Sequence, residues 1–438
     1  MTNHASYQTV RSQGLFTPTR MIFLTLCLTL LPAELFTVAA GGLYLYYSVQ
    51  SGKIANGLAF RIYAPFLVMV GYGIILSGHN DRYDMLKDSW YALKLCLCLG
   101  LGCMIGFAET DSRAGLKALV TFATVTSVLV VIFWIAFGIT PMSPTSTGEA
   151  EAGFRLPLVA VAAIPVLLEQ MKAKRRDGFI PCAAQLVTIL LAVLVSDSRI
   201  TILSASVMVI AWTGSLANTR KAAIGVIASI AIGAAIWQLL PEYNGGPLTV
   251  AIKLRRSLDE VLLTDGFDPT QMLLNWRGFE AYNAQLMFDQ ASLGRKIFGH
   301  GLGATVDLGT SVDIGGDEPF RYLPILHNGY YNILIKYGVI GLAIYIFAVV
   351  RLAFMGLATS GRGLIEDRIL RGLVIIILMS TAVITGLYNK TVLHSTAVVT
   401  AWLIGLLWRC KVNAGDPKAV RIKSSNQDRA IFAPQATR

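Results

Sequence analysis

Long apolar runs recur along this chain and constrain its fold more than any other feature. A helix needs about 20 consecutive apolar residues to cross a bilayer, and runs of about that length repeat between short polar segments. Only 14% of the 438 residues are charged, against about 25% in soluble domains. The sequence therefore predicts an all-α polytopic membrane protein.

The apolar runs predict eleven spans, at residues 21–48, 57–77, 89–107, 116–139, 154–170, 179–196, 200–217, 222–240, 329–356, 369–388 and 392–409. The first is ambiguous because Pro32 and Glu34 interrupt it, so it is either one tilted helix or a broken pair. With both chain ends on one side, the number of crossings must be even. We therefore favour 12 spans, with either two crossings in the first run or one span not recognised.

The net charge of +11 comes from short basic clusters between the apolar runs. Such clusters are typical of cytoplasmic loops and do not indicate nucleic-acid binding. Four clusters are assigned to the cytoplasm on this basis: residues 172–176, 220–221, 362–371 and 409–429. The long polar segment at 241–326 is then predicted to lie outside.

Hydropathy divides the chain into four parts: an N-terminal membrane bundle (1–240), a large outer loop (241–326), C-terminal membrane helices (327–410) and a basic cytoplasmic tail (411–438). A loop of that length is usually functional or contains structure of its own. Its periodicity predicts amphipathic helices over 248–263 and 271–290. A tight turn is predicted at Gly299–Gly303.

His327 lies where the outer loop meets the next apolar run, and Asn328 follows it directly. A free imidazole has a pKa of about 6.5 and exchanges its proton near neutral pH. His327 is either an interfacial histidine bonded to the backbone or a general base at the mouth of a membrane helix. Gly338 and Gly341 fall on one face of that helix and predict close helix packing. Lys336 is interpreted as an interfacial anchor.

Several arginines lie at predicted outer turns or in the outer loop. Arg199 either pairs with Asp197 at the interface or binds an anion, because a guanidinium stays charged and grips phosphate oxygens bidentately. Arg277, in the predicted loop helix, is either a surface charge or a second anion-binding group. Arg321 is either a third cation at that site or the partner of Asp317 or Glu318. Arg155 is interpreted as an anchor at the start of a span.

Other catalytic chemistries have no support in the sequence. The five histidines show no metal-binding spacing, and no glycine-rich stretch opens a nucleotide-binding unit. The six cysteines lie in or beside the apolar runs, so no disulfide framework is predicted outside. We therefore expect neither a metal nor a cofactor.

The motifs together resemble the O-antigen ligase and Wzy polymerase superfamily of bacterial envelope proteins. The resemblance covers about residues 190–350 and is carried by His327-Asn328, then nine residues and Gly338-x-x-Gly341; by Ser198-Arg199 at an outer turn; and by Arg277 ahead of Gly299-x-Gly-x-Gly303. One departure is the stretch after Phe154, which lacks the Pro-Asn element often found near the fifth span of ligase-like sequences. That departure weakens the assignment of Arg155 to the site.

The resemblance implies a GT-C-like, metal-independent glycosyltransferase in the bacterial inner membrane, with its site facing the periplasm. Such enzymes move a glycan from a polyprenyl pyrophosphate to an acceptor sugar, here expected with inversion. If the roles of the family's residues are transferred to this sequence, Arg199 and Arg277 would hold the pyrophosphate and His327 would assist the acceptor hydroxyl. The residues implied for substrate binding are Arg321, Asn328 and Arg155.

The resemblance does not separate a ligase, which attaches a finished glycan, from a polymerase, which joins lipid-linked repeat units of O-antigen or exopolysaccharide. We favour the ligase by a small margin. A secondary transporter or flippase is the alternative from another class, although the sequence shows no inverted repeat. Implied partners are the polyprenyl-linked donor, a lipid or glycan acceptor and membrane lipids, with a flippase and a chain-length regulator as further candidates.

Overall fold

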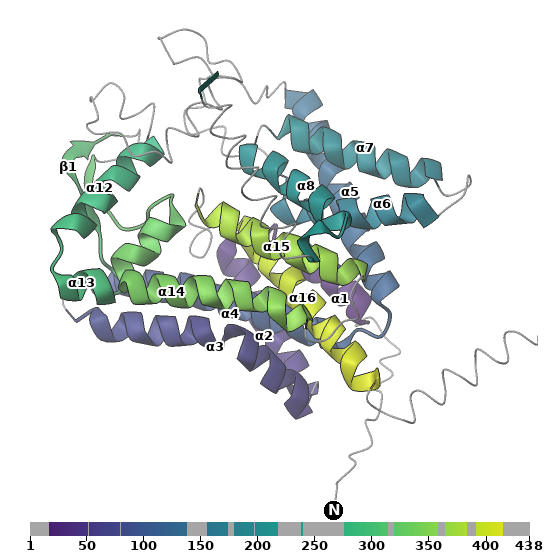
Figure 1. Ribbon diagram of the computed structural model, residues 1–438, viewed down its shortest axis with the longest axis horizontal. Coiled ribbons are helices and arrows are strands. Elements are labelled where there is room, and N and C mark those ends of the chain that lie inside the picture. Colours follow the sequence, from purple (N-terminus) through teal and green to yellow (C-terminus); the bar gives the residue numbers. More distant parts are fainter. Residues whose placement is uncertain are drawn as a thin grey trace, which may run out of the picture.

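The computed structural model describes residues 17–50, 52–78, 80–137, 156–173, 179–196, 198–217, 238–239, 276–313, 319–357, 364–382 and 391–414. These residues are mostly helical, with one small sheet (Figure 1). The elements are α1 (Pro18–Leu28), α2 (Ala33–Gln50), α3 (Gly52–Leu76), α4 (Arg82–Ala108), α5 (Ser112–Phe137), η2 (Leu158–Ala162), α6 (Ala163–Ala173), α7 (Phe179–Val195), α8 (Arg199–Trp212), η4 (Ser215–Ala217), α12 (Trp276–Gln290), α13 (Leu293–Phe298), β1 (Val306–Val312), β2 (Phe320–Leu323), α14 (Gly329–Leu357), α15 (Ile365–Thr381) and α16 (Thr391–Ala414).

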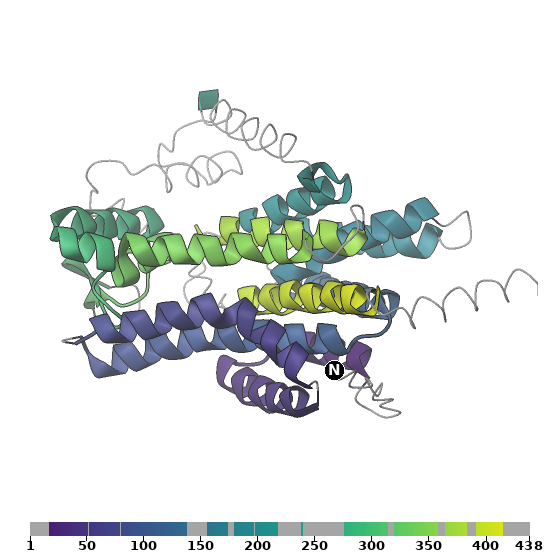
Figure 2. The same cartoon turned by 60° about the horizontal axis from the view of Figure 1, so that its bottom comes forward.

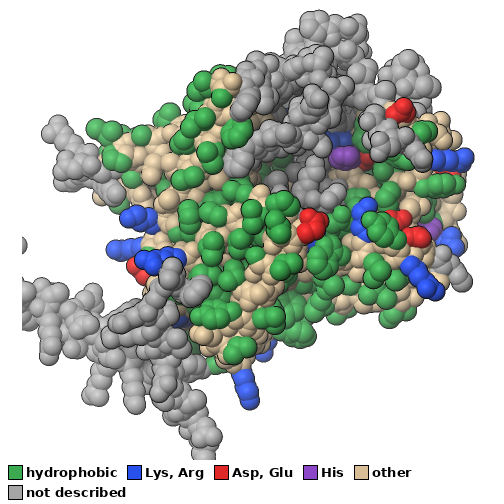
Figure 3. Space-filling model, turned by 180° about the vertical axis from the view of Figure 1, so that it is seen from behind, with side chains coloured by type: hydrophobic (Ala, Val, Ile, Leu, Met, Phe, Trp, Pro, Cys, Tyr) green, Lys and Arg blue, Asp and Glu red, His purple; other side chains and the backbone are tan. Residues whose placement is uncertain are grey.

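The outer surface of the bundle is that of a membrane protein. Within the described residues, five helices are long and apolar enough to cross a membrane: Gly52–Leu76, Arg82–Ala108, Ser112–Ala136, Gly329–Met355 and His394–Val412. Their outward faces carry large apolar side chains, such as Ile75 at 81% exposure and Phe347 at 64%. Figure 3 shows apolar side chains over the middle of one face, with charged side chains gathered toward its two ends. Such a belt favours lipid over water, and the predicted all-α polytopic fold is confirmed.

Apart from α12 and α13, the described helices lie at the predicted spans, with ends that differ by several residues. The predicted span at 222–240 and the amphipathic helix at 248–263 lie outside the described residues. The rest pack in layers (Figure 2): α16 runs between α3 and α4 on one side and α14 and α15 on the other. In this arrangement α16 forms the centre of the bundle.

The first predicted run is a broken pair that returns to the side from which it starts. α1 begins beside the end of α4, where Thr19 Oγ1 donates to Glu109 Oε2 at 2.8 Å. The chain turns ahead of Pro32, and α2 leads into the start of α3, where Ser48 Oγ donates to Asn56 Oδ1 at 2.9 Å. Because α3 and α4 are joined by a short turn at the far end, both contacts lie at the same end. With 11 residues, α1 is roughly 16 Å long and does not cross a core of about 30 Å.

Close packing of α4 on α16 depends on small residues that the sequence analysis did not single out. A Cβ at Gly102 would overlap the backbone carbonyl of Val398, and one at Gly106 would overlap that of Trp402. This spacing of small residues four apart lets two membrane helices approach backbone to backbone. α4 is therefore held close to α16. This packing fixes the position of α4, which also contacts the candidate site.

A polar head closes one end of the bundle, on the left in Figure 1. It consists of α12, α13 and an antiparallel pair in which Val306 of β1 faces Leu323 of β2. The helix predicted over 271–290 is confirmed by α12 and the turn at Gly299–Gly303 by three glycines with positive φ. The two strands were not predicted from the sequence.

Candidate active site

Helix α12 is fixed between the hairpin and the start of α14. Phe279 packs with Leu308 and Val312 of β1, while Ala284 joins a second cluster with Leu326 and Ile335. Two apolar faces on one short helix leave little freedom for it to rotate. The side chain of the residue after Phe279 therefore points in a fixed direction.

That residue is Glu280, and it holds His327 by two atoms. The backbone N–H of His327 donates to Glu280 Oε2 at 2.9 Å, and His327 Nδ1 lies 2.9 Å from Oε1. A carboxylate only accepts hydrogen bonds, so Nδ1 carries a proton in this contact, and in the neutral tautomer that fits it Nε2 keeps the lone pair. The His327 side chain is 43% exposed while that of Glu280 is 2% exposed. The arrangement is an oriented base with its partner buried behind it.

The side chain of Asn328 accepts hydrogen bonds from the backbone that follows it. Its Oδ1 accepts from the backbone N–H groups of Tyr330 at 3.0 Å and Tyr331 at 3.3 Å. These are first-turn donors of α14 that have no partner within the helix. Asn328 thus caps the helix that follows His327, and its predicted role in substrate binding stays a prediction.

Arg277 lies on the same helix as Glu280, three residues before it. Side chains three apart on a helix are neighbours, with Cβ atoms about 5–6 Å apart. Arg277 is exposed, whereas Glu280 is buried. The helix therefore presents a cation to solvent one turn from the carboxylate that holds His327.

Arg199 is half-buried at the first position of α8. α8 is antiparallel to α15, because Arg368 Nη1 donates to the carbonyl of Trp212 at 2.9 Å while Gly372, one turn later in α15, lies against Met208, one turn earlier in α8. Carried along both helices, this register places Arg199 level with Thr381 at the end of α15. Tyr330, three residues after the histidine, donates its hydroxyl to a carbonyl in that last turn of α15 at 2.7 Å. Arg199 and His327 therefore lie toward the same end of α15.

Arg321 is paired within the hairpin. Its Nε and Nη2 donate to the two carboxylate oxygens of Asp307 at 2.7 and 2.8 Å. The Arg321 guanidinium and the N–H of Gly309 lower the pKa of the Asp307 carboxyl. This contact partly neutralises Arg321, whose proposed contact with substrate remains a prediction. Arg155 lies outside the described residues.

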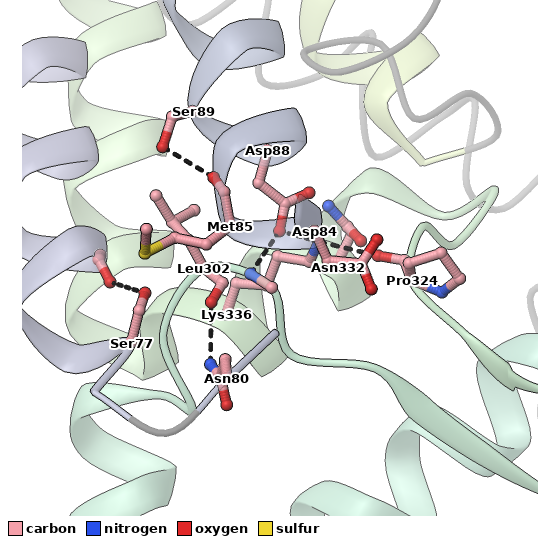
Figure 4. A network of polar contacts seen from close by, with 12 residues as sticks. Ser77, Asn80, Asp84, Met85, Asp88, Ser89, Leu302, Pro324, Asn332 and Lys336 are labelled. Carbon is pink, nitrogen blue, oxygen red and sulfur yellow. Dashed lines mark hydrogen bonds and ion pairs between the residues drawn. The ribbon is translucent and has the colours of Figure 1, made fainter. Parts of the chain in front are cut away.

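A second acid–base pair lies entirely inside the protein (Figure 4). Lys336 of α14 forms an ion pair with Asp88 of α4, and the two side chains are 1% and 2% exposed. Lys336 also donates to the carbonyl of Pro324 at 2.7 Å, and Asp88 accepts from the N–H of Gly303 at 2.7 Å. The interpretation of Lys336 as an interfacial anchor is therefore wrong. It joins α4, the glycine turn and the segment that leads to His327.

The glycine turn packs on a break in α14. Gly338 has φ 66° inside the helix, and a Cβ there would overlap the carbonyl of Ile297. His300 N donates to the carbonyl of Ile335 at 2.8 Å, and Asn80 Nδ2 donates to the carbonyl of His300 at 2.8 Å. Gly338 thus admits the backbone of the last turn of α13 and of the glycine turn, at a break in α14 and not on a regular helical face. Burial, followed by the charge of Arg295, lowers the pKa of His300.

Glu280 and Asp88 were missed in the sequence. Glu280 follows Arg277 by one helical turn, and an acid on the apolar side of an amphipathic helix signals a buried partner. Asp88 directly precedes a predicted span, and an acid at membrane depth usually has a partner or a function. Neither pattern identifies the residue that pairs with the acid, because both partners come from distant segments of the chain.

The fold and the site define a polytopic, all-α membrane protein with an oriented histidine at its polar end. Residues 184–346 match the family model described as O-antigen ligase. That stretch runs from α7 into α14 and contains Arg199, Arg277, Glu280 and His327, so the resemblance found in the sequence is confirmed for this part of the chain. No curated protein matches the sequence.

A metal centre has no support in the described part of the chain. No three side chains of histidine, cysteine, aspartate or glutamate gather there in a way that could hold a metal ion. The described cysteines, including Cys96, Cys98 and Cys103 in the core of α4, are free thiols. Metal-independent chemistry stays a prediction.

Proposed function

We propose that this protein is an O-antigen ligase-type glycosyltransferase that moves a glycan from a polyprenyl pyrophosphate donor to an acceptor sugar. The proposed site is the polar end of the bundle, facing the periplasm. The observation that carries the proposal is the pair formed by His327 and Glu280, within a segment that matches the O-antigen ligase family. A half-exposed imidazole with its proton on the buried side suits proton abstraction from a substrate hydroxyl.

In the proposed reaction, His327 Nε2 takes the proton of the acceptor hydroxyl. The acceptor oxygen then forms a bond to the anomeric carbon while the bond from that carbon to the pyrophosphate oxygen breaks. The pyrophosphate leaves with the bonding electrons, and a single in-line displacement inverts the anomeric carbon. The carboxylate of Glu280 stabilises the imidazolium that forms, as an acid beside a catalytic histidine does.

The leaving group carries the negative charge, so fixed cations are needed where it departs. Arg277 is exposed one helical turn from Glu280, and Arg199 lies toward the same end of α15 as His327. A guanidinium matches phosphate oxygens bidentately and keeps its charge at any physiological pH. We assign these two arginines to the pyrophosphate and expect no requirement for a metal.

Glycan profiling of a deletion strain tests the proposal. The strain is complemented with the wild-type protein or with His327→Ala, and membrane insertion of both is compared. Full-length polymer left on the polyprenyl carrier, with none on the final acceptor, supports a ligase. Single repeat units in place of polymer would indicate a polymerase, and unchanged glycans in both strains would contradict the proposal and favour a transporter.

A further inference from the structure

A polar pocket lies at the opposite end of the bundle from His327. It has a volume of about 440 Å³ and is formed by α5, α6 and α7, with Arg113, Lys117, Gln170 and Gln185 among its lining residues. α4 runs from the polar head to this end, and α5 begins directly after it. The basic loops predict this end to be cytoplasmic. A volume of this size is typical of sites for small ligands.

The pocket carries positive charge without an acid among its lining residues. Arg113 and Lys117 are four residues apart on α5, and like charges at that spacing repel each other. Both are exposed, and within the described residues neither forms an ion pair. The nearby acids are engaged elsewhere: Asp111 accepts from the backbone N–H of Arg113 at 3.0 Å, and Glu169 accepts from an indole N–H at 3.1 Å. Among the residues that the structure describes, the two cations therefore have no carboxylate partner.

Neutral donors complete the lining. Gln170 Oε1 accepts from the thiol of Cys182 at 3.4 Å, which leaves the amide nitrogen as a donor. Cys182 and Pro181 belong to the first turn of α7, where the helix dipole adds positive potential. Cations, amide donors and a helix start around one hollow favour an anion.

The surroundings point to a lipid. Ile180 and Val187 of α7 are large apolar side chains exposed at 75% and 62% on the face of the helix that is turned away from the pocket, so α7 itself borders the apolar belt. Residues 172–176, which precede α7, form a basic run in the sequence. Basic pockets between membrane helices on the cytoplasmic side are sites for lipid headgroups.

We propose that the pocket formed by Arg113 and Lys117 binds the phosphate group of an anionic phospholipid in the adjacent leaflet. Arg113 supplies a bidentate grip on two phosphate oxygens and Lys117 a second positive charge. The apolar wall made by Val120 and Pro181 accommodates the glycerol and the first part of the acyl chains. This inference does not depend on the glycosyltransferase chemistry, because the pocket and His327 lie at opposite ends of the bundle.

The test is lipid binding to the purified full-length protein in detergent micelles, followed by native mass spectrometry. The probes are phosphatidylglycerol, phosphatidylcholine and inorganic phosphate. The variant is Arg113→Gln with Lys117→Gln. The control is Arg20→Gln with Lys53→Gln, which removes two exposed cations from the same end outside the pocket.

We expect phosphatidylglycerol to bind in preference to phosphatidylcholine, and the pocket variant to lose roughly 30-fold in affinity. That figure follows because each basic side chain at an anionic leaflet is worth about fivefold. The control variant should bind like the wild type. Equal losses in both double variants would overturn the proposal in favour of general surface charge, and inorganic phosphate that competes at equal concentration would overturn the assignment to a lipid.

Discussion

Two acid–base pairs tie the start of α14 to neighbouring helices, and they differ in exposure. His327 with Glu280 leaves its base 43% exposed, whereas Lys336 with Asp88 is 1% and 2% exposed. The open pair is accessible to a substrate, and the closed pair is not. A buried pair instead fixes the segments that carry its members, because removal of one partner leaves an uncompensated charge. The difference assigns chemistry to the first pair and positioning to the second.

Lys336→Met breaks the closed pair and has the largest expected effect on stability. Asp88 would remain buried without its cation, which typically costs about 3–5 kcal/mol. Thermal unfolding in detergent measures the loss. Asp88→Asn added to Lys336→Met should recover part of it, because an amide oxygen still accepts from the Gly303 N–H. A single variant as stable as the wild type would contradict a positioning role.

Glu280→Gln tests the open pair without the loss of a side chain. The backbone N–H of His327 requires an acceptor, so the Gln oxygen takes that bond and its NH₂ group faces Nδ1. The imidazole is then driven to the tautomer with its proton on Nε2, which cannot act as a base. We expect a roughly hundredfold lower transfer rate with unfolding close to the wild type. An unchanged rate would remove Glu280 from the mechanism.

Arg277→Ala and Arg277→Lys separate charge from geometry at the open site. Loss of the cation should lower the transfer rate by about tenfold to hundredfold, since leaving-group stabilisation is a large catalytic term. Lysine should restore little of it, because a point charge lacks the bidentate fork. The matched control is Arg295→Ala, an exposed arginine on α13 to which no role in glycan transfer is assigned. Full activity in Arg277→Ala would exclude Arg277 from the proposed mechanism.

The smallest expected effect is a pH dependence at the glycine turn beside the closed pair. The pKa of His300 is lowered by burial and by Arg295, so the fold favours its neutral form. The His300 contribution is therefore complete above the ordinary imidazole pKa of about 6.5 and is lost as the pH falls through the lowered pKa. We expect the melting temperature of the wild type to fall between pH 7 and 5 by on the order of 1 °C more than that of His300→Gln. Equal falls in melting temperature in the wild type and His300→Gln would contradict this prediction.

Much of the fold was predictable from the sequence because the bilayer imposes a length on apolar helices. The helix around Arg277 follows from local chemistry and was predicted, and the break at Pro32 was one of the two alternatives left open. The strands at Val306–Val312 and Phe320–Leu323 were not, because they are short, and their pairing is a contact between segments.

The site was predictable in part. His327 and Arg277 stand out by residue type and position. Glu280 and Asp88 do not, because their roles depend on partners 47 and 248 residues away in the chain. The glycine motif was assigned to packing on a helical face, whereas Gly338 breaks its helix and there admits the last turn of α13 and the turn at Gly299.

Glycan transfer by purified His327→Ala from a polyprenyl-pyrophosphate donor, measured beside wild type and Lys336→Met, tests the role of His327 as the catalytic base. We predict a loss of about 10²–10⁴-fold in His327→Ala, with a smaller fall in melting temperature than in Lys336→Met. Lys336→Met should instead lose stability first. Wild-type transfer by a correctly folded His327→Ala protein would contradict the assignment of the open pair as the catalytic base.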